Sequence, residues 1–168
     1  MNKVRFLPSQ VLCTLYHTMV APYILYAITT WYGCPNYNRN RIQVLQSKCI
    51  RIIKNLDRRT NTTSDRRSLG ILSVGDIYFH QIGLFMYNII INSPNSEFSY
   101  IVSQSVPTHT HDTRNAGALR PPRIDRTRCR HSIEYVGINV WNLIPDAIKH
   151  ANSTNVFKSQ LKKHLLNP

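Results

Sequence analysis

Residues 40–56 read NRIQVLQSKCIRIIKNL, and this stretch predicts the best-defined helix of the chain. Its apolar positions fall within about 100° of arc on a helical wheel: Ile42, Leu45, Cys49, Ile52, Ile53 and Leu56. Basic side chains occupy the opposite side: Arg41, Lys48, Arg51, Lys54 and Arg58. No acidic residue interrupts the stretch, so ion pairs four residues apart cannot account for the basic face. The pattern predicts a helix with one face on a core and cations on the other.

The composition favours a folded, strongly basic protein. The chain has 168 residues, of which 42% are hydrophobic, enough for a sizeable core. Lys and Arg number 21 against 8 Asp and Glu, which gives a net charge of +13. Such a surplus favours a polyanionic partner, most commonly nucleic acid. The alternative is that the charge only maintains solubility.

A helix is predicted before this stretch and a polar loop after it. A helix is expected to start at Pro8–Ser9, with Pro22 as a kink or break, and residues 33–36 (GCPN) predict a turn. Residues 57–67 read as a polar loop with two Arg pairs.

Two further helices are predicted towards the C-terminus. Ser73 and Asp76 resemble a capping box, and the segment that follows to Ile90 is apolar nearly all round, as expected of a buried central helix. Ser153 predicts the start of a last helix. Its inward positions would be Val156, Phe157, Leu161 and Leu165, and its outward positions Lys158, Lys162 and Lys163.

Residues 92–118 are rich in Ser, Pro, Thr, Asn and His, which favours a linker or a docked surface loop. Alternating Arg126, Arg128 and Arg130 predict a basic strand. A second short strand is expected through Ile133, Tyr135 and Val140. Together they predict a small hairpin.

Motifs that carry chemistry are missing from the sequence. The carboxylates are scattered, with no adjacent Asp pair for two metal ions, and there is no phosphate loop or hydrolase elbow. The cysteines (Cys13, Cys34, Cys49 and Cys129) lack zinc spacing and are expected to be free thiols. His109 and His111 are expected on a surface loop. We therefore expect a chain without catalytic residues, metal, cofactor, membrane span or small-molecule substrate.

Short sequence words in a fixed order resemble the region after the catalytic palm of LINE-type (non-LTR retrotransposon) reverse transcriptases, of the jockey and chicken-repeat-like kind. The first words are LY at 15–16, PYILY at 22–26, LQSKCIR at 45–51, LGIL at 69–72, DIY at 76–78 and FMY at 85–87. The later words are HDTR at 111–114, the arginines at 120, 123 and 126, SI at 132–133, WN at 141–142, FK at 157–158 and LK at 161–162. They extend over most of the chain.

The resemblance implies a thumb-like helical domain over residues 1–92, a linker over 93–118 and a small basic module over 119–168, made of the hairpin and one helix. The expected fold class is therefore mainly α with a small α+β C-terminal module. The family's Ala-Asp-Asp motif is absent, so the resemblance implies that this chain has no polymerase activity of its own. It implies RNA or DNA as partner, the palm of the parent protein as a second partner, and an intracellular, nuclear or cytoplasmic, location.

Two groups of cations are the expected nucleic-acid contacts, because guanidinium and ammonium groups bind phosphate oxygens. The first group is Arg41, Lys48, Arg51, Lys54, Arg58, Arg59, Arg66 and Arg67; the second is Arg120, Arg123, Arg126, Arg128 and Arg130. Aromatic side chains near them could stack on bases: Tyr32, Tyr37, Tyr135 and Trp141. The alternative function is a structural or protein-interaction remnant of a decayed element.

Overall fold

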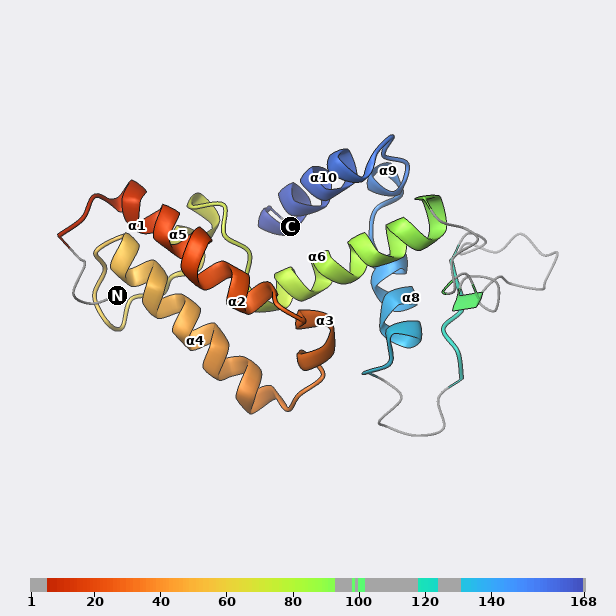
Figure 1. The fold of residues 1–168 in the computed structure, drawn as a ribbon, viewed down its shortest axis with the longest axis horizontal. Coiled ribbons are helices and arrows are strands. Elements are labelled where there is room, and N and C mark those ends of the chain that lie inside the picture. Colours follow the sequence, from red (N-terminus) through yellow and green to blue (C-terminus); the bar gives the residue numbers. More distant parts are fainter. Residues whose placement is uncertain (1–5, 93–97, 99, 102–117, 124–130, 168) are drawn as a thin grey trace. The chain divides into compact units, whose positions relative to one another are not determined.

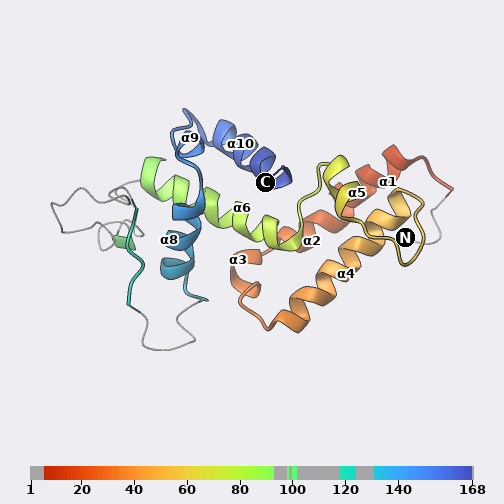
Figure 2. The same cartoon turned by 180° about the vertical axis from the view of Figure 1, so that it is seen from behind.

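The computed structural model describes residues 6–92, 98, 100–101, 118–123 and 131–167, and its regular elements within them are all helices (Figure 1). They are α1 (Ser9–Leu15), η2 (Tyr16–Val20), α2 (Ala21–Leu25), α3 (Ile28–Trp31), α4 (Asn36–Ile53), α5 (Thr63–Ser68), α6 (Val74–Tyr87), η3 (Asn88–Asn92), α8 (Ile133–Leu143), α9 (Asp146–Lys149) and α10 (Thr154–Leu166). The expectation of a mainly α fold is confirmed. Figure 2 gives the opposite view.

The chain divides into two compact units, Met1–Tyr78 with His164–Pro168, and Phe79–Lys163. This boundary lies inside α6, whereas composition placed the division after residue 92. Most of the predicted linker, residues 93–118, lies outside the described residues.

Pro22 changes the register of the first helical run without breaking it. Proline lacks the N–H that would continue the i→i−4 ladder. The chain accommodates it with the π-helical turn η2, and the N–H of Ala21 donates to the carbonyl of Tyr16, five residues back. The helix then continues as α2 and ends before Ala27, whose φ of 48° is left-handed.

Helix α4 begins at Asn36, four residues before the predicted start, directly after Pro35 at its N-cap position. Its buried residues are Gln46, Ile50, Ile52 and Ile53. Leu45, predicted to be in the core, is 57% exposed. That prediction is wrong because the buried face of α4 is centred nearer to Gln46 than to Leu45. Gln46 binds Tyr16 of η2 and Leu72, which follows α5.

Gln46 joins three segments of the first unit. Its side chain is 1% exposed, and its Nε2 donates to the hydroxyl of Tyr16 and to the carbonyl of Leu72, both at 2.9 Å. Its Oε1 accepts from Gln43, whose own Oε1 accepts from the N–H of Val74 at 3.0 Å. Burial raises the pKa of the Tyr16 phenol, which keeps this acceptor neutral. The network fixes α4 against η2 and the start of α6.

The segment predicted as a polar loop contains a short helix. Asn61 Oδ1 accepts hydrogen bonds from the N–H and hydroxyl of Thr63, where α5 begins. The predicted capping box of α6 is confirmed. Asp76 N–H donates to Ser73 Oγ and the Ser73 N–H donates to Asp76 Oδ2, both at 3.1 Å.

The core of the second unit contains aromatic and aliphatic side chains of α6, α8 and α10. Phe157 stacks on Tyr87 at a ring-centroid distance of 4.2 Å and on Trp141 at 6.3 Å. A Cβ at Gly83 would lie 2.8 Å from Cδ2 of Leu161, so glycine permits this close approach. The predicted start of α10 is confirmed, since Ser153 Oγ accepts from the Val156 N–H at 3.3 Å. Phe157 and Leu161 are buried as predicted and Leu165 is half-buried, but Val156 is 43% exposed and the prediction for it is wrong.

The predicted hairpin is wrong for its second strand. Ile133, Tyr135 and Val140 lie in helix α8, which Ser132 caps by accepting from the Tyr135 N–H at 3.4 Å. Residues 118–123 form no strand either. Their backbone is bound by a side chain instead, because Asn142 accepts from Leu119 N–H at 3.0 Å and donates to its carbonyl at 2.8 Å. Residues 124–130 lie outside the described residues.

We expect Gln46→Leu to lower the free energy of unfolding by about 1–3 kcal/mol, because it leaves the Leu72 carbonyl and the Tyr16 hydroxyl without the amide donor. Urea unfolding measures the change. The matched control Gln160→Leu lies on an exposed position of α10 and should stay within about 0.5 kcal/mol of wild type. Equal stability of the Gln46 variant would contradict the role given to this side chain.

His80 should make the stability of the second unit depend on pH. Burial lowers the pKa of its imidazole from the ordinary 6.5, and Lys158 and Lys162 lower it further, although the hydrogen bond to the Lys158 carbonyl (3.1 Å) acts the other way. The folded state therefore favours neutral His80. Its contribution is complete above the unfolded pKa and is lost as pH falls through the window below 6.5.

Urea unfolding of the wild type and of His80→Gln, at about pH 7.5 and about pH 5.5, tests this prediction. The wild type should lose more stability on acidification than the variant, which keeps an N–H donor but does not titrate. Identical losses in the two proteins would refute it.

Candidate nucleic-acid interface

A basic hollow of about 820 Å³ lies beside the C-terminal half of α4. Its polar lining comprises Lys48, Arg51, Asp57 and Arg58, and its apolar lining Val44, Ile52 and Leu56. The turn after α4 makes it possible: Asn55 adopts a left-handed φ of 51°, and the Leu56 N–H donates to the Arg51 carbonyl at 2.8 Å. This turn returns the chain along the helix.

Arg51 connects the two sides of the hollow. Its Nε donates to the carbonyl of Thr60 at 3.0 Å, which ties the loop after α4 back to the helix. Lys48 and Arg58 also line the hollow, and both are exposed. Three cations therefore face one carboxylate, Asp57, so the hollow favours an anionic group. Lys54 and Arg59 are exposed in the same segment.

Arg66 is engaged within the fold. Its Nη1 lies 3.2 Å from Asp76 Oδ2 and donates to the Ile71 carbonyl at 3.3 Å, and its side chain is only 12% exposed. The ion pair joins α5 to the capping box of α6. Arg66 thus supports the fold, whereas its neighbour Arg67 is exposed.

Arg41 is exposed but does not line the hollow. Its guanidinium lies 5.6 Å from the ring centroid of Tyr37, which is also exposed. The other aromatic candidates for stacking are less accessible. Trp141 is a core residue, Tyr135 is half-buried, and half-buried Tyr32 stacks on Tyr78 at 4.1 Å.

The second predicted cluster is described only in part. Arg120 and Arg123 are exposed in residues 118–123 and belong to the second unit. Arg126, Arg128 and Arg130 lie outside the described residues. A joint phosphate-binding surface of these five arginines stays a prediction.

Thiols and histidines form no metal cluster within the described ranges, where no three His, Cys, Asp or Glu side chains come together. Cys13, Cys34 and Cys49 are free and half-buried, and burial raises the pKa of the Cys49 thiol. Cys129, His109 and His111 lie outside the described residues. Among the helices that the structure describes, none is both long and apolar enough to cross a membrane.

Sequence reasoning identified the cations of the hollow but missed how they are assembled. The left-handed Asn55, the Thr60 carbonyl and the opposing Asp57 were not predicted. Asparagine after the last helical residue is a signal for such a turn. Comparison with known proteins gives no family model, no curated protein and no solved structure that matches the chain.

We expect Arg66→Gln to destabilise the protein by about 1–3 kcal/mol, because it breaks a partly buried hydrogen-bonded ion pair and leaves Asp76 without its cation. Urea unfolding measures the loss, and RNA affinity is compared at a temperature where the variant is folded. The exposed neighbour provides the control Arg67→Gln, expected within about 0.5 kcal/mol of wild type. A stable Arg66 variant with weakened RNA binding would instead make Arg66 a phosphate contact.

Proposed function

We propose that this chain is a non-catalytic nucleic-acid-binding part of a LINE-type reverse transcriptase, from the region after the palm, and that it grips the phosphate backbone of RNA or DNA. The observation that carries the proposal is the hollow beside α4, where Lys48, Arg51 and Arg58 converge.

The chemistry of the hollow suits phosphate. A guanidinium offers two parallel donors to phosphate oxygens, and Arg58 is exposed for such contact. Lys48 adds a point charge. Arg51 is held by the Thr60 carbonyl through Nε alone, and its Nη groups form no hydrogen bond within the part of the chain that the structure describes. Contacts of this kind position a backbone without reading bases, so binding should be salt-dependent and of low sequence specificity.

The resemblance in sequence supports the same proposal. Residues 45–51, LQSKCIR, carry one of its longest words, and they lie in α4. This word contributes both Lys48 and Arg51 to the hollow. In the parent protein such a surface would hold template, primer or element RNA while other domains perform the chemistry.

A protein-interaction role is the second candidate. It is favoured by apolar side chains of the first unit that are largely exposed, among them Met19, Tyr23 and Tyr26. This role is compatible with phosphate binding, since these residues do not line the hollow.

The test is binding of labelled structured RNA and of primed single-stranded DNA across a salt series. In the variant Lys48→Gln, Lys54→Gln, Arg58→Gln, three exposed cations beside the hollow are removed. We expect weaker binding and a shallower slope of log K against log salt, by about 0.7–0.9 for each phosphate that the variant no longer neutralises. Arg51→Lys keeps the positive charge but removes the two parallel N–H donors of the guanidinium, so it should weaken binding less than the triple variant does.

The matched control is Lys158→Gln, Lys162→Gln, Lys163→Gln, which removes the same charge from exposed positions of α10. This control should retain most of the affinity. Equal losses in the two triple variants would mean that net charge alone attracts nucleic acid, and the hollow would have no special role.

A further inference from the structure

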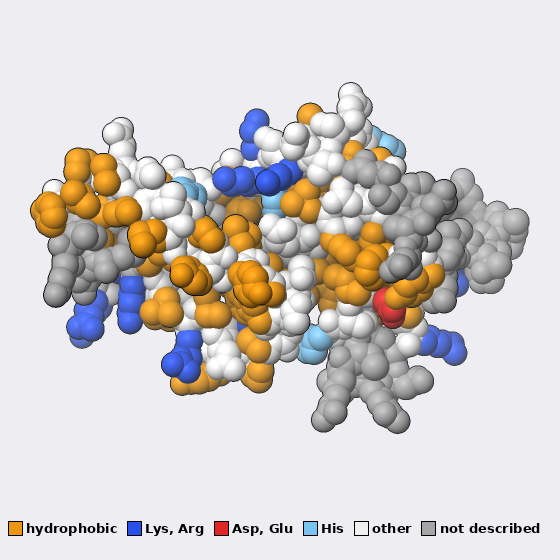
Figure 3. Space-filling view, viewed as in Figure 1, with side chains coloured by type: hydrophobic (Ala, Val, Ile, Leu, Met, Phe, Trp, Pro, Cys, Tyr) orange, Lys and Arg blue, Asp and Glu red, His pale blue; other side chains and the backbone are white. Residues whose placement is uncertain are grey.

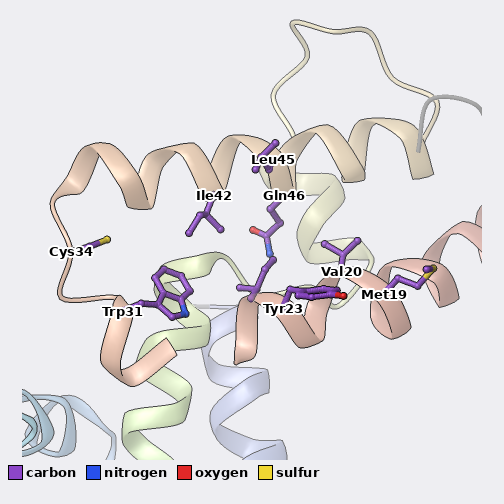
Figure 4. A pocket seen from close by; sticks show the side chains of 9 residues that line it. Met19, Val20, Tyr23, Trp31, Cys34, Ile42, Leu45 and Gln46 are labelled. Carbon is purple, nitrogen blue, oxygen red and sulfur yellow. The ribbon is translucent and has the colours of Figure 1, made fainter. Parts of the chain in front are cut away.

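A second concave surface of the first unit is apolar. A groove of about 560 Å³ lies between α4 and the run formed by η2 and α2 (Figure 4). Ile42 points into it from α4 and Leu45 lies on the α4 rim, Met19 and Tyr23 line the opposite side, and Trp31 and Cys34 close one end. Gln46 forms part of its floor, where its amide is engaged by the buried network.

The rims of the groove are exposed hydrophobic side chains. Tyr23 is 83%, Met19 is 63% and Leu45 is 57% exposed. Met19 in η2 and Tyr23 in α2 both line the groove, and Tyr26, directly after α2, is 80% exposed. Figure 3 shows hydrophobic side chains gathered over this part of the molecule. An apolar surface of this extent beside a groove is typical of a contact site for another chain.

The α4 rim of the groove is also cationic. Arg41 and Lys48 lie four residues before and three after Leu45, so they flank it on the helix surface. No Asp or Glu precedes Asp57 in the sequence, and neither cation forms an ion pair within the described residues. Charge complementarity therefore favours an occupant that places acidic groups beside this rim.

We propose that the groove binds an amphipathic helix of a partner protein, whose apolar stripe enters the groove and whose acidic residues face Arg41 and Lys48. These two cations are seven residues apart on one helix, a rise of about 10.5 Å. Acidic residues two turns apart on the partner helix match this spacing. The mode is helix-in-groove recognition with charged flanks. This site is separate from the phosphate hollow: Lys48 lines the hollow and lies one helical turn from Leu45, which lines the groove.

Other occupants fit less well. A second copy of this chain would carry a net charge of +13 towards the same cationic rim. The phosphates of a nucleic acid could contact Arg41 and Lys48, but the apolar walls of the groove would be left without a complementary surface. A lipid surface would contact the exposed rims but would leave half-buried Ile42 and Trp31 inside the groove without a partner.

The experiment uses two labelled helical peptides of roughly 18 residues, long enough to form an isolated helix. Both carry one leucine stripe; one has two Glu residues seven positions apart beside it, and the other has Lys at these positions. Fluorescence anisotropy with the full chain should give about tenfold tighter binding of the Glu peptide. The variant Arg41→Glu, Lys48→Glu should reverse this preference.

Leu45→Glu should abolish binding of the Glu peptide, because it places a carboxylate in the apolar groove. The matched control Leu143→Glu changes a residue that is 70% exposed in the second unit and should bind as wild type does. Bound Glu peptide should also slow alkylation of Cys34, which lines the groove.

Equal binding of the two peptides, or no effect of the charge reversal, would overturn the proposal. So would a wild-type dimer that Leu45→Glu dissociates in sedimentation, because the occupant would then be a second copy. A Leu45→Glu variant that loses RNA binding as strongly as peptide binding would assign the groove to nucleic acid. Loss of RNA binding in Lys54→Gln, Arg58→Gln bears only on the hollow, so failures of the two proposals are distinguishable.

Discussion

The buried amide of Gln46 determines how the first unit is arranged. A side-chain amide in an apolar core must have its donors and its acceptor satisfied, since each unsatisfied group costs free energy. Only one rotation of α4 brings Gln46 to Tyr16 and Leu72 at once. Consecutive helical residues point about 100° apart, so Leu45 is directed to the exposed side. The groove on that side is thus a consequence of hydrogen bonding inside.

The same rotation gives α4 two outward surfaces of different chemistry. One side, through Arg51 and Lys48, faces the basic hollow completed by the turn after the helix. The other side, through Ile42 and Leu45, borders the apolar groove. A single helix could therefore bind a phosphate backbone and a partner helix on neighbouring surfaces. Lys48 lies between them, and it couples the electrostatics of the two proposed sites.

The positive charge of the chain is divided between structural and surface roles. Arg66 forms an ion pair with Asp76 and donates to the Ile71 carbonyl, and these contacts support the start of α6. Arg51 is partly engaged, since only its Nε is bound by Thr60. Exposed cations such as Lys54 and Arg58 have no comparable structural bond within the described residues. Net charge does not distinguish these cations from one another; only their hydrogen-bond partners do.

Sequence by itself determined what depends on neighbours within a helical turn. The helical runs of α4 and α6, the capping box of Ser73 and the start of α10 at Ser153 follow from such short-range hydrogen bonds and periodicity, whereas α5 and α8 were not predicted. The tertiary structure decided the rest, because contacts between distant residues override local patterns. Gln46 reaches Tyr16 across 30 residues and turns the buried face of α4, and Asn142 binds Leu119 across 23, within the C-terminal module for which a hairpin was expected. Periodicity identifies an amphipathic helix, but it cannot specify which long-range partner fixes its rotation.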